Sequence, residues 1–228
     1  MTLAKLKGVI LDIDGTLLDS NDAHAMAFAK AFAEHGIEIP FEHVRPLVGM
    51  GGDKLIPSLT GFQHDTPEGK AIAERKNGIF EERYLPRLKP TRGAHALLER
   101  MIADGLTLVV ATSAGADEMK ALLRQAGVDD LIDAATSSGD VENSKPDPDV
   151  IGAAIKKSKL KADELIMLGD TPYDIEAARK AGVPTIVVRC GGWWDDDALE
   201  GAMAIFDDPT DLLEHWPIVA LSDSVVLC

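Results

Sequence analysis

The feature that most constrains the fold is a regular alternation of short apolar runs with segments of helical periodicity from residue 92 onward. Such an alternation is typical of a parallel β-sheet covered by helices. Between two of the runs, Leu122, Leu123 and Ala126 recur at helical spacing, and Gly127 then supplies a natural helix end. The predicted strands are residues 8–13, 106–111, 132–136, 165–168 and 185–188. We therefore expect an α/β protein with a parallel sheet at its centre.

The stretch of residues 19–89 breaks this alternation, because it looks helical and contains no convincing strand. Its first helix carries Phe28 and other apolar residues on one face and is predicted to end near Gly36. We therefore expect a core made of residues 1–18 and 90–228, with a helical cap inserted after the first strand.

The composition is that of an ordinary globular protein, with 46% apolar and 27% charged residues in a chain of 228. A net charge of −15 argues against nucleic acid or an anionic membrane as a partner, because both select for basic surfaces. No apolar run is long enough to span a bilayer, and the N-terminal residues lack the pattern of a signal peptide. We expect a cytoplasmic monomer or homodimer that acts on a small molecule.

The cysteines and histidines indicate no metal centre. Cys190 and Cys228 form no disulfide framework and no cluster spaced for zinc, so both are expected to be ordinary thiols. None of the histidines of the predicted cap, His24 among them, belongs to a metal-binding spacing. We assign no role to either residue type.

The strongest functional signal is a pair of carboxylates, Asp12 and Asp14, directly after the first predicted strand. In parallel α/β sheets, ligands bind outside the carboxyl ends of the strands. One carboxylate can attack phosphorus as a nucleophile, and the other can protonate the leaving oxygen. Gly15 would let backbone N–H groups approach a phosphate closely. The alternative interpretation is an Asp-rich turn that caps a helix.

Three later segments are expected to reach the same edge of the sheet. Thr112 and Ser113 follow one predicted strand, and Asp170 and Asp174 follow another. Lys145 lies in a loop beside a proline, which makes it a plausible fixed cation for a phosphate. Each residue alone also has an ordinary interpretation, as a helix cap or a solvated loop residue. The whole set at strand ends is far more specific than its parts.

Carboxylates gathered at one edge repel one another unless a cation lies among them. Oxygen ligands without histidine or cysteine favour Mg²⁺. Such an ion would shield Asp12 from the charge of an anionic substrate and, with Lys145, stabilise a transferring phosphoryl group. A metal also explains how so acidic a chain could bind a phosphate ester.

These four segments, in this order and with a helical insertion after the first, resemble the haloacid dehalogenase superfamily with its first class of cap. The resemblance covers nearly the whole chain and implies a doubly wound, Rossmann-like core. It also implies that Asp12 forms an aspartyl-phosphate, that Asp14 is the general acid and then the base, and that Lys145 bridges phosphate and nucleophile. Thr112 would bind the phosphoryl oxygens. The implied Mg²⁺ ligands are Asp12, the backbone carbonyl of Asp14, Asp170 and, directly or as an orienting group, Asp174.

The superfamily contains several enzyme classes, and Asp14 favours phosphoryl chemistry because dehalogenases of the family generally lack this second aspartate. A phosphonatase would need a cap lysine that forms a Schiff base. The lysines available for this are Lys30, Lys54, Lys70 and Lys76, each expected on a solvated face. A phosphatase is therefore the favoured class, with a sugar-phosphate mutase as the alternative and a non-catalytic binding protein as a further one.

The cap segment that runs from Arg45 through Gly52 is similar to that of phosphoglycolate phosphatase-like proteins. Gly49 could let the cap backbone approach a small substrate, or it could simply end a helix. Arg45 is a candidate for binding a substrate carboxylate. Trp193 and Trp194 follow the last predicted strand, where they could recognise substrate, form a dimer contact or pack into the protein.

Overall fold

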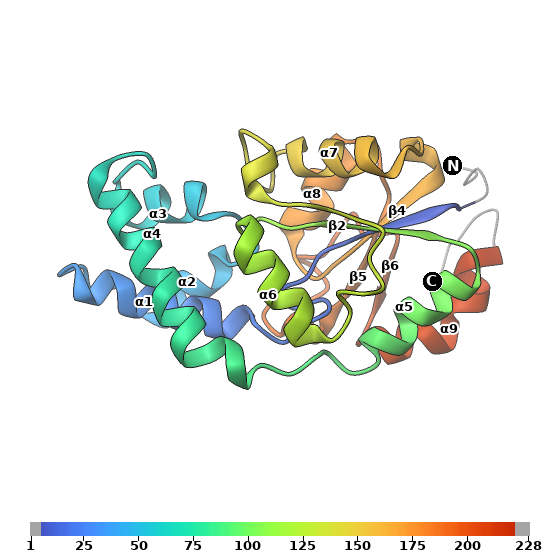
Figure 1. Ribbon diagram of the computed structural model, residues 1–228, viewed down its shortest axis with the longest axis horizontal. Helices are drawn as coiled ribbons and strands as arrows, with labels where there is room; N and C mark the ends of the chain where they lie inside the picture. The colour runs from blue at the N-terminus through green and yellow to red at the C-terminus, as the bar shows by residue number, and fades with distance from the viewer. Residues whose placement is uncertain (1–5, 222–228) are drawn as a thin grey trace.

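The computed structural model describes residues 6–221 and has a parallel sheet at its centre (Figure 1). In this part of the chain six strands form one sheet in the order β3-β2-β1-β4-β5-β6. The strands are β1 (Gly8–Leu11), β2 (Thr107–Ala111), β3 (Ala134–Thr136), β4 (Leu165–Gly169), β5 (Thr185–Val188) and β6 (Ala204–Phe206). This is the strand order of doubly wound folds, so the predicted fold class is confirmed. The order reverses between β1 and β4, where such sheets bind their ligands.

All five predicted strands are present, with small differences at their ends. β1 stops two residues early, because the N–H of Leu17 donates to the carbonyl of Ile13 and the chain turns there. The last strand, β6, was missed by the sequence analysis. It has only three residues at the sheet edge, which is too short a run for periodicity to reveal.

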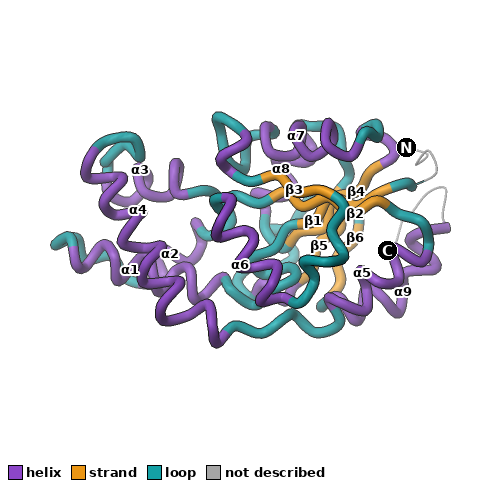
Figure 2. The backbone as a smooth tube through the Cα atoms, viewed as in Figure 1, coloured by secondary structure: helices purple, strands orange, loops and turns teal. Residues whose placement is uncertain are grey.

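Helices cover both faces of the sheet (Figure 2). The helices of the core are α5 (Ala94–Ala103), α6 (Ala116–Ala126), α7 (Asp149–Ser158), α8 (Pro172–Lys180) and α9 (Pro209–Leu221). Side chains alternate along a strand, so Val9 and Leu11 join the apolar cluster under α5, α6 and α9. Ile10 lies between them and packs in the cluster with α7 and α8. A central strand buried on both sides explains why β1 reads as continuously apolar.

Between β1 and α5 the chain forms helices that lie beyond the carboxyl end of the sheet (Figure 1). They are α1 (Asn21–Glu34), α2 (Phe41–Val44), α3 (Gly52–Thr60) and α4 (Pro67–Ile79), and we call residues 21–87 the helical insertion. Phe32, Leu55 and Ile72 belong to an apolar cluster built only from insertion residues. Ala27 and Phe80 instead join the cluster of the core, which fixes the insertion against it. The predicted helical character is therefore correct, while the predicted domain boundaries stay a prediction.

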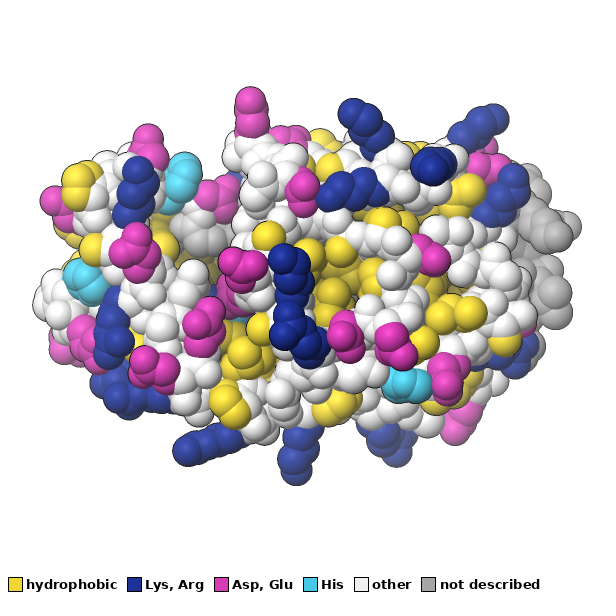
Figure 3. Space-filling model, viewed as in Figure 1, with side chains coloured by type: hydrophobic (Ala, Val, Ile, Leu, Met, Phe, Trp, Pro, Cys, Tyr) yellow, Lys and Arg dark blue, Asp and Glu magenta, His cyan; other side chains and the backbone are white. Residues whose placement is uncertain are grey.

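The described helices and the surface bear on the expectations drawn from the composition. None of the helices in residues 6–221 combines the length and apolar character needed to cross a bilayer. On the face drawn in Figure 3, acidic and basic side chains are interspersed rather than gathered by sign. Burial raises the pKa of the Cys190 thiol to about 12, which keeps it protonated at neutral pH. Cys228 lies outside the described residues.

Candidate active site

The site is centred on Asp12, the first residue after β1. Its N–H donates to the carbonyl of Leu168 at 2.9 Å, which continues the pairing of β1 with β4. Its carboxylate is buried, and Oδ1 accepts a hydrogen bond from Lys145 Nζ at 2.5 Å. Thr16 places its hydroxyl 3.5 Å from the second oxygen, Oδ2. One carboxylate oxygen is thus held by a cation and the other is only weakly bonded.

Lys145 is the fixed cation of the site. Its side chain is 1% exposed, and Nζ lies 2.8 Å from Asp174 Oδ1 in addition to its bond with Asp12. Burial by itself would lower the pKa of Lys145, but the charges of Asp12 and Asp174 outweigh it and hold the pKa above its usual range. The lysine therefore stays positively charged, although it is removed from water.

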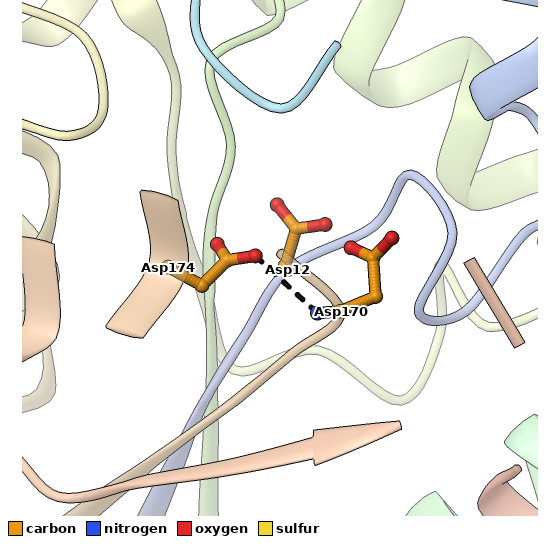
Figure 4. A group of neighbouring side chains, drawn as sticks. All are labelled: Asp12, Asp170 and Asp174. Carbon is orange, nitrogen blue, oxygen red and sulfur yellow. Dashed lines mark hydrogen bonds between the residues drawn. The ribbon is translucent and has the colours of Figure 1, made fainter. Parts of the chain in front are cut away.

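Three buried aspartates lie close together at this edge of the sheet (Figure 4). Asp12, Asp170 and Asp174 each offer one oxygen within 4.8 Å of the others. Asp170 follows β4, and its Oδ2 accepts from Asn21 Nδ2 at 2.7 Å. Asp174 closes the first turn of α8, where its Oδ2 accepts from the hydroxyl of Thr171 at 2.7 Å. Asp174 is thus both a helix cap and a site residue, because its Oδ1 faces Lys145.

The charges of this cluster are suited to a divalent cation. Burial raises the pKa of Asp12 to about 7, because the effect of Lys145 is outweighed by burial together with Asp174 and Asp14. Burial, together with the charges of Asp174 and Asp12, raises the pKa of Asp170 well above its usual range. A Cβ at Gly191 would lie 1.8 Å from an oxygen of Asp170, so the position requires glycine to leave room for this carboxylate. Buried, mutually repelling carboxylate oxygens fit a hard ion such as Mg²⁺.

Asp14 lies outside this cluster and has different partners. Its Oδ1 accepts from the hydroxyl of Ser20 at 2.5 Å and lies 2.9 Å from His24 Nε2. Burial would raise the pKa of Asp14, but His24 and Ser20 outweigh burial and hold the pKa below its usual range. The sequence analysis gave no role to His24. The available signal was the helical spacing of His24 to Ala27 and Ala31, which lie on the buried face of α1.

A small cavity opens in front of these residues, between the core and the helical insertion. It has a volume of about 70 Å³ and is lined by Asp12, Asp14, Thr112, Ser113 and Gly49, among others. Gly49 has a φ of +115°, and a Cβ there would lie 2.8 Å from Thr171. The position therefore requires glycine. The structure therefore places these five residues, all predicted to belong to the site, around one cavity.

Gly15 has a different role from the predicted one. It does not line this cavity, and its N–H donates to the carbonyl of Leu18 at 2.7 Å instead of pointing to a phosphate. A Cβ at Gly15 would lie 2.2 Å from Asp170 and 2.1 Å from Asn21. The glycine therefore makes room for the bond between those two side chains.

Arg45 also differs from its prediction as a ligand for a substrate carboxylate. It is buried away from the cavity, where Nε donates to Asp22 at 2.6 Å and Nη2 donates to the carbonyl of Gly191. Its guanidinium lies 5.6 Å from the centre of the Trp193 ring. The arginine is occupied in joining the helical insertion to the loop after β5.

The two adjacent tryptophans also lie where the helical insertion meets the core. Trp193 meets Phe41 of the insertion edge to face, with ring centres 6.3 Å apart. Trp194 meets Tyr173 in the same way at 6.1 Å, and the hydroxyl of Tyr173 donates to the carbonyl of Pro46. Neither tryptophan lines the cavity. Substrate recognition, a dimer contact and packing into the protein were the three predicted roles, and these contacts favour packing.

We expect Arg45→Met to lower the free energy of unfolding by about 1.5–3 kcal/mol, the size of hydrogen bonds to a charged group. The substitution keeps the apolar volume but removes the charged donor of the Gly191 carbonyl, which retains only a 3.5 Å hydrogen bond from Asn21. Thermal or denaturant unfolding measures the change. Lys30→Met, which alters an exposed ion pair with Glu34, is the control with little expected effect.

Lys76 was predicted on a solvated face, and the structure corrects this. Its side chain is 7% exposed, and Nζ lies 2.8 Å from Oε1 of Glu118 on α6. The prediction failed because the partner is 42 residues away and belongs to the core. Glu118 was not singled out from the sequence at all. Both residues line the cavity beside Asp14 and His24.

The comparisons with known proteins agree with this geometry. A family model described as haloacid dehalogenase-like hydrolase matches residues 9–188. A phosphoglycolate phosphatase of Rhodospirillum rubrum is 31% identical over 213 residues, covering 89% of this chain and 87% of that protein. A solved hydrolase from Pseudomonas syringae has a TM-score of 0.86 at 28% identity, covering 93% of this chain and 99% of that one. A putative β-phosphoglucomutase from Bacteroides vulgatus has a TM-score of 0.84 at 28% identity, covering 96% and 91%.

The matched range contains every segment on which the resemblance was based, from Asp12 through Lys145 to Asp174. The predicted enzyme class, a phosphatase of this superfamily, is confirmed by the family model and by the phosphatase relative. The chain therefore belongs to the haloacid dehalogenase-like hydrolase family, in the subgroup of phosphoglycolate phosphatase-like and β-phosphoglucomutase-like proteins.

Proposed function

We propose that this protein is a Mg²⁺-dependent phosphatase that hydrolyses a small phosphorylated metabolite through an aspartyl-phosphate on Asp12. The observation that carries the proposal is the different bonding of two carboxylates at the end of β1. Asp12 lines the cavity and is held by Lys145 through one oxygen, while its second oxygen is only weakly bonded. Asp14 lines the same cavity but is bonded to Ser20 and His24. One group is placed to attack and the other to exchange a proton.

In the first step the free oxygen of Asp12 attacks phosphorus, and the bond between phosphorus and the ester oxygen breaks. The leaving oxygen takes a proton from Asp14 and departs as an alcohol. In the second step water attacks the phosphoryl group, Asp14 takes a proton from that water, and Asp12 is released with inorganic phosphate. The lowered pKa of Asp14 keeps the carboxylate deprotonated at neutral pH, so it is free to accept a proton from water. A bound phosphate dianion beside it would raise the pKa again for the acid step.

The remaining residues position the phosphoryl group. Lys145 supplies positive charge next to the attacking oxygen, and Thr112 presents its hydroxyl at the end of β2. Asp12, Asp170 and Asp174, with the backbone carbonyl of Asp14, would hold Mg²⁺. The bound ion would supply charge that shields Asp12 from the anionic ester and stabilises the transferring phosphoryl group.

A sugar-phosphate mutase on the same chemistry is not favoured. The relative named phosphoglycolate phosphatase favours hydrolysis. A cytoplasmic location, the absence of nucleic acid and membrane partners, the oligomeric state and the domain boundaries remain predictions from the sequence.

The test is phosphate release from a panel of phosphorylated metabolites, among them phosphoglycolate and hexose phosphates, with and without Mg²⁺. We expect hydrolysis that falls to background in EDTA and returns when Mg²⁺ is added, because the buried aspartates repel one another without it. Mg²⁺ should also raise the melting temperature, since it binds the folded state. Full activity in EDTA would contradict the metal site. Absence of hydrolysis across the panel would favour a mutase or a non-catalytic binding protein.

A further inference from the structure

The cavity in front of Asp12 shares lining residues with a second, wider cleft. The inner cavity has a volume of about 70 Å³ and the outer cleft about 470 Å³. Lys76 and Glu118 line both spaces, together with Phe28, Gly52 and Ser113. The ion pair between α4 of the insertion and α6 of the core therefore lies where the two spaces meet. A group attached to the phosphate that extends into the outer cleft would lie near this pair.

The pair is nearly closed to solvent. Its side chains are 7% and 10% exposed, and Lys76 Nζ also lies 5.3 Å and 5.0 Å from the ring centres of Phe28 and Phe80. Burial would raise the pKa of Glu118, but Lys76 and His24 outweigh it and hold the pKa below its usual range. The carboxylate is therefore ionised and neutralises the charge of Lys76.

The side chains that line the inner cavity carry more negative than positive charge. Of the described residues that line it, three are acidic, and Lys76 is the one lysine or arginine. Lys145 lies deeper, between Asp12 and Asp174. A second acidic group on the substrate would thus meet no unpaired permanent cation here and would lie near Glu118. Hydroxyl groups, by contrast, can bond to an ion pair without disturbing its charge.

We propose that Glu118 is a specificity-determining residue, which neutralises Lys76 and so selects for compact phosphate esters whose leaving group carries hydroxyls rather than a second acidic group. This inference rests on the proposed phosphatase function and narrows its substrate class to phosphates of small neutral polyols or sugars. The apolar wall of Phe28, Val48 and Leu55 fits the carbon chain of such a leaving group.

The test compares two esters that differ only at the far end, glycerol 3-phosphate and 3-phosphoglycerate, in the Mg²⁺-loaded enzyme. We expect the wild type to have a kcat/KM about tenfold or more higher for glycerol 3-phosphate. Glu118→Gln releases Lys76 to bind a carboxylate. The ratio of the two kcat/KM values should therefore shift toward 3-phosphoglycerate by about tenfold or more, which is the effect of one charge-assisted hydrogen bond. A double variant that adds Lys76→Gln should lose this shift.

The matched control is Asp117→Asn, which changes the same net charge at the neighbouring position of α6. Asp117 is 99% exposed, so the ratio of the kcat/KM values for the two esters should not change. A wild-type preference for 3-phosphoglycerate would overturn the proposal, and this arm does not depend on the folding of any variant. A Glu118→Gln ratio within twofold of wild type would overturn it as well. Absence of hydrolysis of every ester in the panel would instead contradict the phosphatase function itself.

Discussion

Asp12→Asn is expected to abolish Mg²⁺-dependent phosphate release, with a loss of kcat on the order of 10⁴-fold or more. An amide is a poor nucleophile, and the carboxylate that forms the phosphoryl intermediate would be gone. Initial rates with the best ester of the panel measure the loss. Asp19→Asn is the control, because Asp19 is an exposed carboxylate of the same segment and should leave the rate unchanged.

The same variant should fold without loss of stability. The pKa of Asp12 is raised to about 7 in the folded protein, so this carboxylate lowers stability progressively as the pH rises from the ordinary pKa of an aspartate to about 7. This cost is absent below the ordinary pKa of an aspartate and fully present above about 7. A neutral amide removes it, so metal-free Asp12→Asn should melt no lower than wild type at pH 8. Retained turnover in a folded Asp12→Asn protein would exclude the covalent mechanism.

The positions of the main site residues were predictable because they follow from the sheet. Asp12, Thr112 and Asp170 each come directly after a buried apolar run. Parallel strands end at one edge, so recognising the runs was enough to place the three side chains together. Lys145 could be added only through the resemblance and its neighbouring proline, since no strand ends beside it.

The contacts between the helical insertion and the core could not be predicted in this way. Arg45 and Lys76 were judged by their local context, but their partners Gly191 and Glu118 are 146 and 42 residues away. His24 was likewise recognisable as buried but not as a partner of Asp14. Periodicity shows which face of a helix is buried, but it does not show what that face meets. The residues that we propose to shape substrate choice therefore emerged only from the structure.

Lys145→Met is expected to cause the largest loss of stability, about 3–5 kcal/mol at neutral pH, because it leaves buried charges without a partner. Lys145 is 1% exposed and contacts both Asp12 and Asp174. Turnover should also fall strongly, since the cation beside the attacking oxygen is lost. Denaturant unfolding and initial rates measure the two effects.

The pH dependence of that loss distinguishes an electrostatic cause from a packing defect. Without Lys145, the pKa of Asp12 should rise further above its present value of about 7, because the one influence that lowers it is removed. The destabilisation should then be largest at pH 8 and shrink toward pH 5, where the carboxylate is protonated. Adding Asp12→Asn to Lys145→Met should recover part of the lost stability at pH 8, because it removes an unpaired buried charge. An equal loss at both pH values, with no recovery in the double variant, would indicate that Lys145 contributes to stability through packing alone.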